Sequence, residues 1–148
     1  MKHFNNAGPC VENMHYVIDP LVRIDVESME MLIEQQRYFV LHAPRQTGKT
    51  TCLLALMHHL NQQGKYRTLY VNIEAAQAAR GDVSEGIPVV CNALAQAASL
   101  YLEDFSLIQW LHYGAGKPLP PGGQFSALLA EWSRSDPKHP TILFLDEV

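Results

Sequence analysis

One segment of the chain combines glycine, lysine and threonine at the spacing of a phosphate-binding loop. Residues 43–50 (APRQTGKT) match the pattern G-x-x-x-x-G-K-[ST] at every defined position except the first, where alanine replaces glycine. In such loops the backbone N–H groups and the N-terminus of the following helix turn partial positive charge toward phosphate oxygens. Lys49 would place its charge against the β- and γ-phosphates, and the Thr50 hydroxyl would be a ligand of Mg²⁺.

The loop pattern predicts a set of nucleotide-binding residues, some of which also fit a structural role. Arg45 and Gln46 fit a solvated loop tip as well as a phosphate contact, and Thr51 fits either an α-phosphate contact or a simple first helical turn. The full set comprises Pro44, Arg45, Gln46, Thr47, Gly48, Lys49, Thr50 and Thr51. Lys49 is also expected to take part in catalysis, because its charge faces the phosphate that is transferred.

Two acids follow a short apolar run near the other end of the sequence. Residues 142–147 (ILFLDE) place Asp146 and Glu147 directly after four apolar side chains. Asp146 would hold Mg²⁺ through a coordinated water, and Glu147 would act as a general base or position the attacking water. Taken alone, the two acids also fit a strand that ends in a solvated turn. The phosphate-loop pattern upstream favours the functional interpretation.

The elements around both motifs are predicted to alternate between strands and helices. Residues 38–41 (YFVL) form an apolar run typical of a strand buried on both faces, and a helix with Leu53, Leu56, Met57 and Leu60 on one face follows the loop. Further strands are expected at residues 68–73 and 141–145, with helices near residues 26–34, 90–101 and 125–132, and a surface loop at residues 114–123. This alternation predicts an α/β fold with a parallel sheet, whose ligands bind at the carboxyl ends of the strands.

Residues 1–25 are expected to form an irregular lead-in, because they contain several dipeptides that favour turns. Residues 26–148 would then be the nucleotide-binding domain. We also considered Glu74, which follows the second strand, and the pair His58-His59. Glu74 fits a surface acid better than a site residue, and adjacent histidines on a helix point in different directions and clamp one ion poorly.

Composition narrows the class of protein. The chain has 148 residues, of which 47% are hydrophobic and 18% charged, with a formal net charge of −4. Its 11 Lys and Arg are scattered, so charge does not indicate nucleic-acid binding. No apolar run reaches the roughly 18 residues of a membrane span. Three cysteines at unpatterned spacings fit a reducing compartment, and we therefore expect a cytoplasmic protein.

The sequence resembles the AAA-like P-loop ATPases of bacteria and archaea, close to the archaeal ATPase and STAND-type branches. The resemblance covers nearly the whole chain and is most specific in residues 38–51 (YFVLHAPRQTGKTT), with weaker support in residues 4–10 and 72–77. It implies a three-layer P-loop fold in which Glu147 is the catalytic acid beside Asp146. Some relatives with a similar lead-in and loop carry a nuclease-like domain, which these residues do not contain.

The resemblance also implies elements that would follow the second motif. Members of this division place a sensor strand between the two motif strands, and that strand comes later in the sequence. Because the printed sequence stops at Val148, we expect an amino-terminal part of a longer protein, truncated after the Walker B strand, with weak or absent turnover by itself.

Three functions remain open at the level of sequence. The first is Mg²⁺-dependent ATP hydrolysis that couples nucleotide state to a partner protein or a carboxy-terminal domain. The second is an ATP-binding module without useful turnover, and the third, less favoured, is a small-molecule kinase. ATP rather than GTP is expected from the resemblance and from the lack of an Asn/Thr-Lys-x-Asp motif. The sequence leaves the oligomeric state open.

Overall fold

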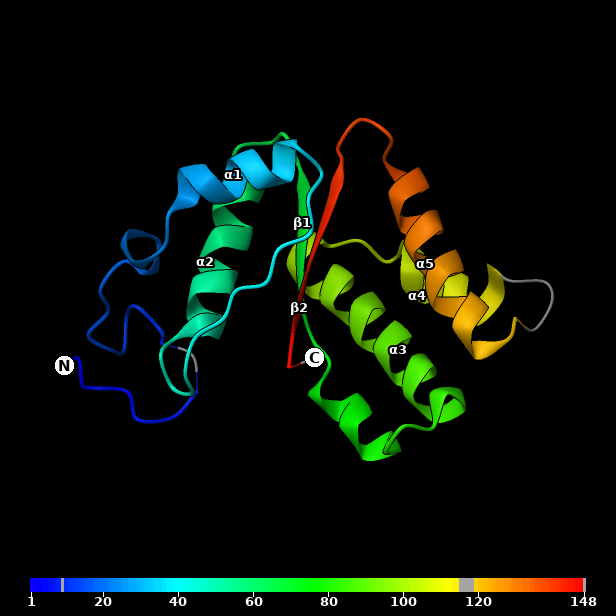
Figure 1. Cartoon of the computed structure of the whole chain (residues 1–148), viewed down its shortest axis with the longest axis horizontal. Coiled ribbons are helices and arrows are strands. Elements are labelled where there is room, and N and C mark those ends of the chain that lie inside the picture. The colour runs from blue at the N-terminus through cyan, green and yellow to red at the C-terminus, as the bar shows by residue number, and fades with distance from the viewer. Residues whose placement is uncertain (9, 115–118, 148) are drawn as a thin grey trace. The chain divides into compact units, whose positions relative to one another are not determined.

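The protein is a mixed α/β chain whose computed structural model describes residues 1–8, 10–114 and 119–147 (Figure 1). It divides into two compact units, Met1–His59 and Leu60–Val148. Each unit is described by itself below. Among the described residues, no helix combines the length and the apolar character that crossing a membrane requires.

The first unit begins with a largely irregular segment, as the turn-forming dipeptides predict. Its ends are tied by two backbone hydrogen bonds, from the His3 N–H to the Met14 carbonyl (3.0 Å) and from the Tyr16 N–H to the His3 carbonyl (3.1 Å). His15 is buried, and its Nδ1 accepts a hydrogen bond from the Val11 N–H at 2.8 Å. A short 3₁₀ helix, Pro20–Arg23, follows, with Asp19 accepting from the Leu21 N–H at its start.

Helix α1 (Val26–Glu34) confirms the first predicted helix. Asp25 caps it, because its carboxylate accepts both the Ser28 N–H (3.0 Å) and the Ser28 hydroxyl (2.6 Å). These hydrogen bonds favour the charged carboxylate and lower the pKa of Asp25.

Helix α2 (Lys49–Gln62) confirms the helix predicted after the loop. Its apolar face is buried at Cys52, Leu53, Leu56, Met57 and Leu60. Gly64, at φ +68°, supplies the left-handed residue that lets the chain turn away after the last helical turn. The His59 side chain meets Glu30 of α1 at 3.1 Å, which joins the two helices of this unit.

The prediction of a buried strand at residues 38–41 is wrong for this structure. The segment has no regular secondary structure, and Tyr38 and Val40 are exposed. A strand exists only where a neighbouring strand accepts and donates its backbone hydrogen bonds, and the described residues offer this segment none. The apolar run alone was therefore insufficient to predict a strand.

The second unit contains a two-stranded parallel sheet, β1 (Arg67–Asn72) paired with β2 (Thr141–Asp146). Both strands confirm their predictions. The pairing runs from Arg67 opposite Thr141 to Asn72 opposite Asp146, and it continues with a hydrogen bond from the Ile73 N–H to the Asp146 carbonyl at 3.1 Å. The carboxyl ends of both strands therefore meet at one edge, where Asp146 lies.

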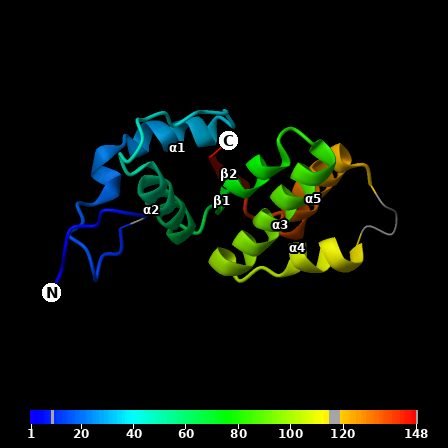
Figure 2. The same ribbon diagram turned by 90° about the horizontal axis from the view of Figure 1, so that it is seen from below.

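The helices of this unit lie on one side of the sheet, as Figures 1 and 2 both show. In chain order they are a 3₁₀ helix at Glu74–Ala79, α3 (Val83–Leu102), α4 (Ser106–Gln109), a π-helical turn at Trp110–Gly114 and α5 (Pro121–Ser135). Parallel strands need such a crossover, because the chain must return to the start of the sheet before it can form the next strand.

Side chains alternate along the strands and so divide between two faces. Leu69 and Val71 of β1 enter the core formed with the helices. The other core residues are Cys91, Leu94, Ala95, Ala97 and Ala98 of α3, Leu107 of α4, and Leu128 and Trp132 of α5. The intervening residues Thr68, Tyr70, Phe144 and Asp146 share the opposite face, and all four are buried.

Two predicted boundaries in this unit differ from the structure. Helix α3 begins at Val83, earlier than the expected residue 90, because Asp82 caps it by accepting the Ser84 N–H at 2.8 Å. Helix α5 includes Pro121, Gly122 and Gly123, which were assigned to a surface loop. Proline suits the first helical turn, where its missing N–H costs no hydrogen bond. Part of that expected loop, residues 115–118, lies outside the described residues.

Candidate functional site

The loop at residues 43–48 takes the tight backbone conformation that its glycine and polar residues permit. Gln46 and Gly48 both have positive φ, +58° and +83°. The Thr47 hydroxyl donates a hydrogen bond to the Pro44 carbonyl at 2.7 Å, which stabilises the turn. Left-handed φ is readily accessible to Gly48 but costs energy at Gln46, so strain is placed within this loop.

Helix α2 begins directly on the loop. Its first internal hydrogen bond runs from the Cys52 N–H to the Gly48 carbonyl at 2.9 Å. The N–H groups of Lys49, Thr50 and Thr51 precede this bond, so helix geometry provides no carbonyl for them within α2. Together with the helix dipole they form a region of partial positive charge suited to an anion.

The lead-in supplies a cation beside this loop that sequence reasoning did not find. A Cβ atom added at Gly48 would lie 3.0 Å from Nη1 of Arg23, which places the Arg23 guanidinium directly beside the loop. Arg23 ends the 3₁₀ helix, whose Pro20 carbonyl accepts a hydrogen bond from the Cys52 thiol at 3.5 Å. Burial raises the pKa of Cys52, and the Arg23 charge opposes that rise. No sequence motif links Arg23 to the loop, because their proximity arises from folding.

The Asp146 side chain, at the end of β2, accepts hydrogen bonds from Tyr70 and from the backbone of Glu147. Its side chain is buried, with Oδ2 accepting from the Tyr70 hydroxyl at 2.9 Å and Oδ1 from the Glu147 N–H at 3.1 Å. Tyr70 belongs to the neighbouring strand and lies on the same face of the sheet. A buried carboxylate with fixed donors has a defined orientation, which a metal ligand requires.

Glu147 leaves the sheet with a strained backbone. Its φ is +59°, uncommon for a residue with a side chain, and the residue is exposed. Its carbonyl accepts a weak hydrogen bond from the Gln77 side chain at 3.5 Å. Such left-handed residues cost about 1–3 kcal/mol and gather at functional sites, so the conformation is notable at the candidate catalytic acid.

The predicted residues therefore fall into two groups. Residues 43–51 belong to the first unit, and Asp146 and Glu147 belong to the second. Of the weaker candidates, Glu74 is exposed at the start of its 3₁₀ helix and His58 is exposed on α2, while His59 is bonded to Glu30.

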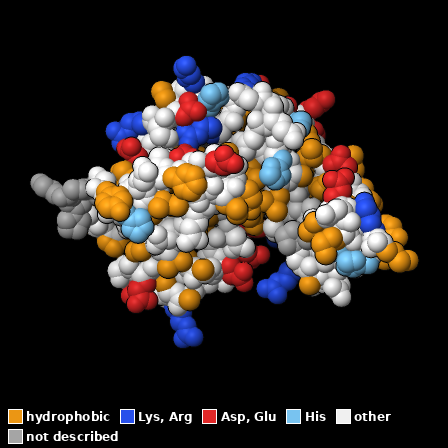
Figure 3. All heavy atoms as spheres, turned by 180° about the vertical axis from the view of Figure 1, so that it is seen from behind, with side chains coloured by type: hydrophobic (Ala, Val, Ile, Leu, Met, Phe, Trp, Pro, Cys, Tyr) orange, Lys and Arg blue, Asp and Glu red, His pale blue; other side chains and the backbone are white. Residues whose placement is uncertain are grey.

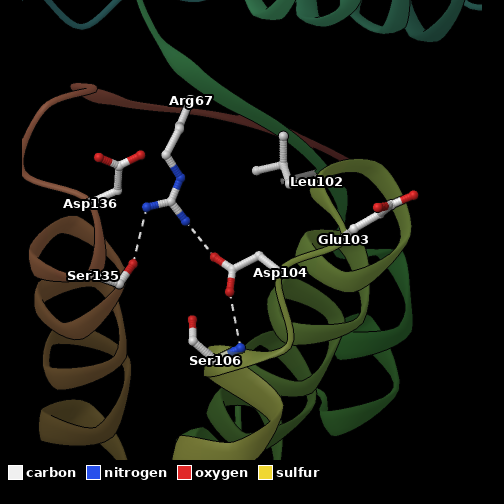
Figure 4. Close-up of a pocket in the computed structure, with 7 residues that line it drawn as sticks. All are labelled: Arg67, Leu102, Glu103, Asp104, Ser106, Ser135 and Asp136. Carbon is white, nitrogen blue, oxygen red and sulfur yellow. Dashed lines mark hydrogen bonds and ion pairs between the residues drawn. The ribbon is translucent and has the colours of Figure 1, made fainter.

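A polar pocket of about 520 Å³ lies at the opposite end of the sheet from Asp146, around the start of β1 (Figure 4). Arg67 reaches into it and forms an ion pair with Asp104 and a 3.0 Å hydrogen bond to the Ser135 hydroxyl. Its guanidinium also lies 5.3 Å from the Trp132 ring centroid. Arg67 is therefore engaged by Asp104, in the connection between α3 and α4, and by two residues of α5, which favours a structural role for this cation.

Charged side chains of both signs are interspersed on the face drawn in Figure 3. Lys and Arg lie there among Asp, Glu and hydrophobic side chains, without a large area of one charge. This agrees with the scattered basic residues of the sequence.

Comparison with known proteins returned no matching family model, no matching curated protein and no matching solved structure.

Proposed function

We propose that this chain binds ATP through residues 43–51 and belongs to a Mg²⁺-dependent ATP-hydrolysing protein of the AAA-like P-loop class. The observation that carries the proposal is the loop of residues 43–48, which opens directly onto helix α2. Gly48 there combines a φ of +83° with close approach by another residue, and Lys49 and Thr50 begin the helix. The sequence pattern and the local backbone conformation both support the proposal of an anion-binding loop.

The side chains present fit ATP and Mg²⁺ chemically. Lys49 and the helix amides offer positive charge and donors for phosphate oxygens, and Arg23 adds a second cation beside the loop. Thr50 and Asp146 offer the oxygen ligands that Mg²⁺ prefers, and this ion usually takes only one or two protein ligands beside phosphate and water. When bound, Mg²⁺ would neutralise charge that develops on the β- and γ-phosphates.

Glu147 would act on the water that attacks the γ-phosphorus. The water oxygen forms a bond to phosphorus as the bond from phosphorus to the β–γ bridging oxygen breaks, and ADP leaves with that electron pair. The proton lost by the water passes to the Glu147 carboxylate, which returns it to solvent or to the released phosphate. An exposed acid on a strained strand end is accessible to such a water. The change in nucleotide state would alter contacts with a partner protein or a further domain.

A phosphate-release assay with ³²P-labelled ATP tests this function against its alternatives. The hydrolase proposal predicts labelled inorganic phosphate that requires Mg²⁺ and no added acceptor. Label that appears only on an added small molecule would indicate a kinase. Saturable ATP binding without release of label, even in single-turnover conditions, would indicate a binding module and contradict hydrolysis by this chain.

A further inference from the structure

Tyr70 makes a buried contact with the candidate metal ligand that no sequence motif predicts. It lies in the middle of β1, is 6% exposed, and donates its hydroxyl to Asp146 Oδ2 at 2.9 Å. In the strand register Tyr70 stands opposite Phe144 and Asp146 opposite Asn72, so the two partners are diagonal neighbours. A tyrosine side chain is long enough to span that diagonal.

The hydrogen bond from Tyr70 restricts the orientation of the Asp146 carboxylate, in addition to giving the buried Tyr70 hydroxyl a partner. The Asp146 side chain accepts one hydrogen bond from the neighbouring strand and one from the following peptide, on different oxygens. The second donor, the Glu147 N–H, is close in sequence and would follow the carboxylate in several rotamers. The Tyr70 hydroxyl comes from the neighbouring strand, so its hydrogen bond restricts the orientation of the carboxylate independently of the segment that follows Asp146.

We propose that Tyr70 is a positioning residue that orients Asp146 for Mg²⁺ when ATP binds, an inference that rests on the proposed function. Tyr70 itself would touch neither nucleotide nor metal. Groups that orient a metal ligand in this way typically change metal affinity by 10- to 100-fold when they are removed. The Tyr70→Phe variant is therefore expected to need about 10-fold more Mg²⁺ for half-maximal stimulation of ATP binding.

A purely structural role for Tyr70 predicts a different result. Phenylalanine keeps the ring that fills this face of the sheet and removes only the hydroxyl. If the hydroxyl served folding alone, Tyr70→Phe would lower the unfolding temperature, and the Mg²⁺ dependence of the folded protein would stay unchanged.

The experiment measures ATP affinity by calorimetry across a Mg²⁺ titration and in EDTA, with thermal unfolding of each variant. Thr68→Val is the matched control, because Thr68 is buried on the same face of β1 and its hydroxyl has no hydrogen-bond partner among the described residues. Removal of that hydroxyl should leave the Mg²⁺ requirement at the wild-type value. Affinity in EDTA should be equal in all three proteins.

A double-mutant cycle with Asp146→Asn tests whether Tyr70 acts through Asp146. We expect Tyr70→Phe to have no further effect on Mg²⁺ dependence in the Asp146→Asn background, and the cycle remains informative if the single variant is less stable. The role of Tyr70 would be overturned, with the proposed function intact, by either of two results. One is an equal Mg²⁺ concentration for half-maximal ATP binding in wild type and Tyr70→Phe, and the other is additive effects in the double-mutant cycle. If the ATP affinity of the wild-type protein did not depend on Mg²⁺, the proposed function would be overturned, and the role of Tyr70 with it.

Discussion

Replacement of Lys49 with alanine is expected to weaken Mg-ATP binding by roughly a hundredfold or more. Lys49 would meet two phosphates, and each hydrogen bond to a charged group contributes about 1.5–3 kcal/mol, of which about 1.4 kcal/mol corresponds to a factor of ten in affinity. Alanine has the highest helix propensity, so α2 should keep its first turn. Calorimetric titration with Mg-ATP measures the change directly.

Lys138→Ala is the control for this prediction. Lys138 is exposed after α5 and lies outside both candidate groups, so its removal changes the net charge by the same amount without touching the loop. If Lys49→Ala and Lys138→Ala both bound Mg-ATP with the wild-type affinity, residues 43–50 could not be assigned as a phosphate loop.

Neutral substitutions of Asp146 and Glu147 are expected to affect different steps, Mg²⁺-dependent ATP binding for Asp146 and hydrolysis for Glu147. Glu147→Gln should retain bound ATP while hydrolysis slows by about 10²–10⁴-fold, the range attributed to general acid–base groups. Asp146→Asn should weaken the Mg²⁺-dependent part of ATP binding, because an amide is a poorer ligand for the cation. Single-turnover quench experiments measure hydrolysis, and titrations with and without Mg²⁺ measure binding.

The difference between the two variants is the informative quantity. Glutamine keeps the size of Glu147 and its exposed position, so unfolding temperatures should match the wild type. Hydrolysis at the wild-type rate in Glu147→Gln would show that this residue neither activates nor positions the water.

Local sequence patterns predicted several helices and strands that the structure contains. The apolar face of Leu53, Leu56 and Leu60 predicted α2, and short apolar runs predicted β1 and β2. Residues 38–41 carry an equally clear apolar run, yet they form no strand, because pairing depends on a partner that a local pattern cannot supply.

The candidate site divides in the same way. Gly48, Lys49 and Thr50 could be proposed from the sequence because a phosphate loop needs contiguous residues at fixed spacing, and the φ of +83° at Gly48 is compatible with such a loop. Arg23 and Tyr70 could not be predicted. Arg23 comes close to Gly48 across 25 positions of the sequence, and Tyr70 contacts Asp146 across 76, in each case through folding within one unit.

Site-resolved amide hydrogen exchange with and without Mg-ATP tests the central claim most directly, because it reports on the N–H groups proposed to hold phosphate. The account predicts slower exchange at residues 45–51 when Mg-ATP is added, and no such change in Lys49→Ala. If the protein is saturated with Mg-ATP and exchange at residues 45–51 stays at the nucleotide-free rate, the nucleotide does not bind at this loop.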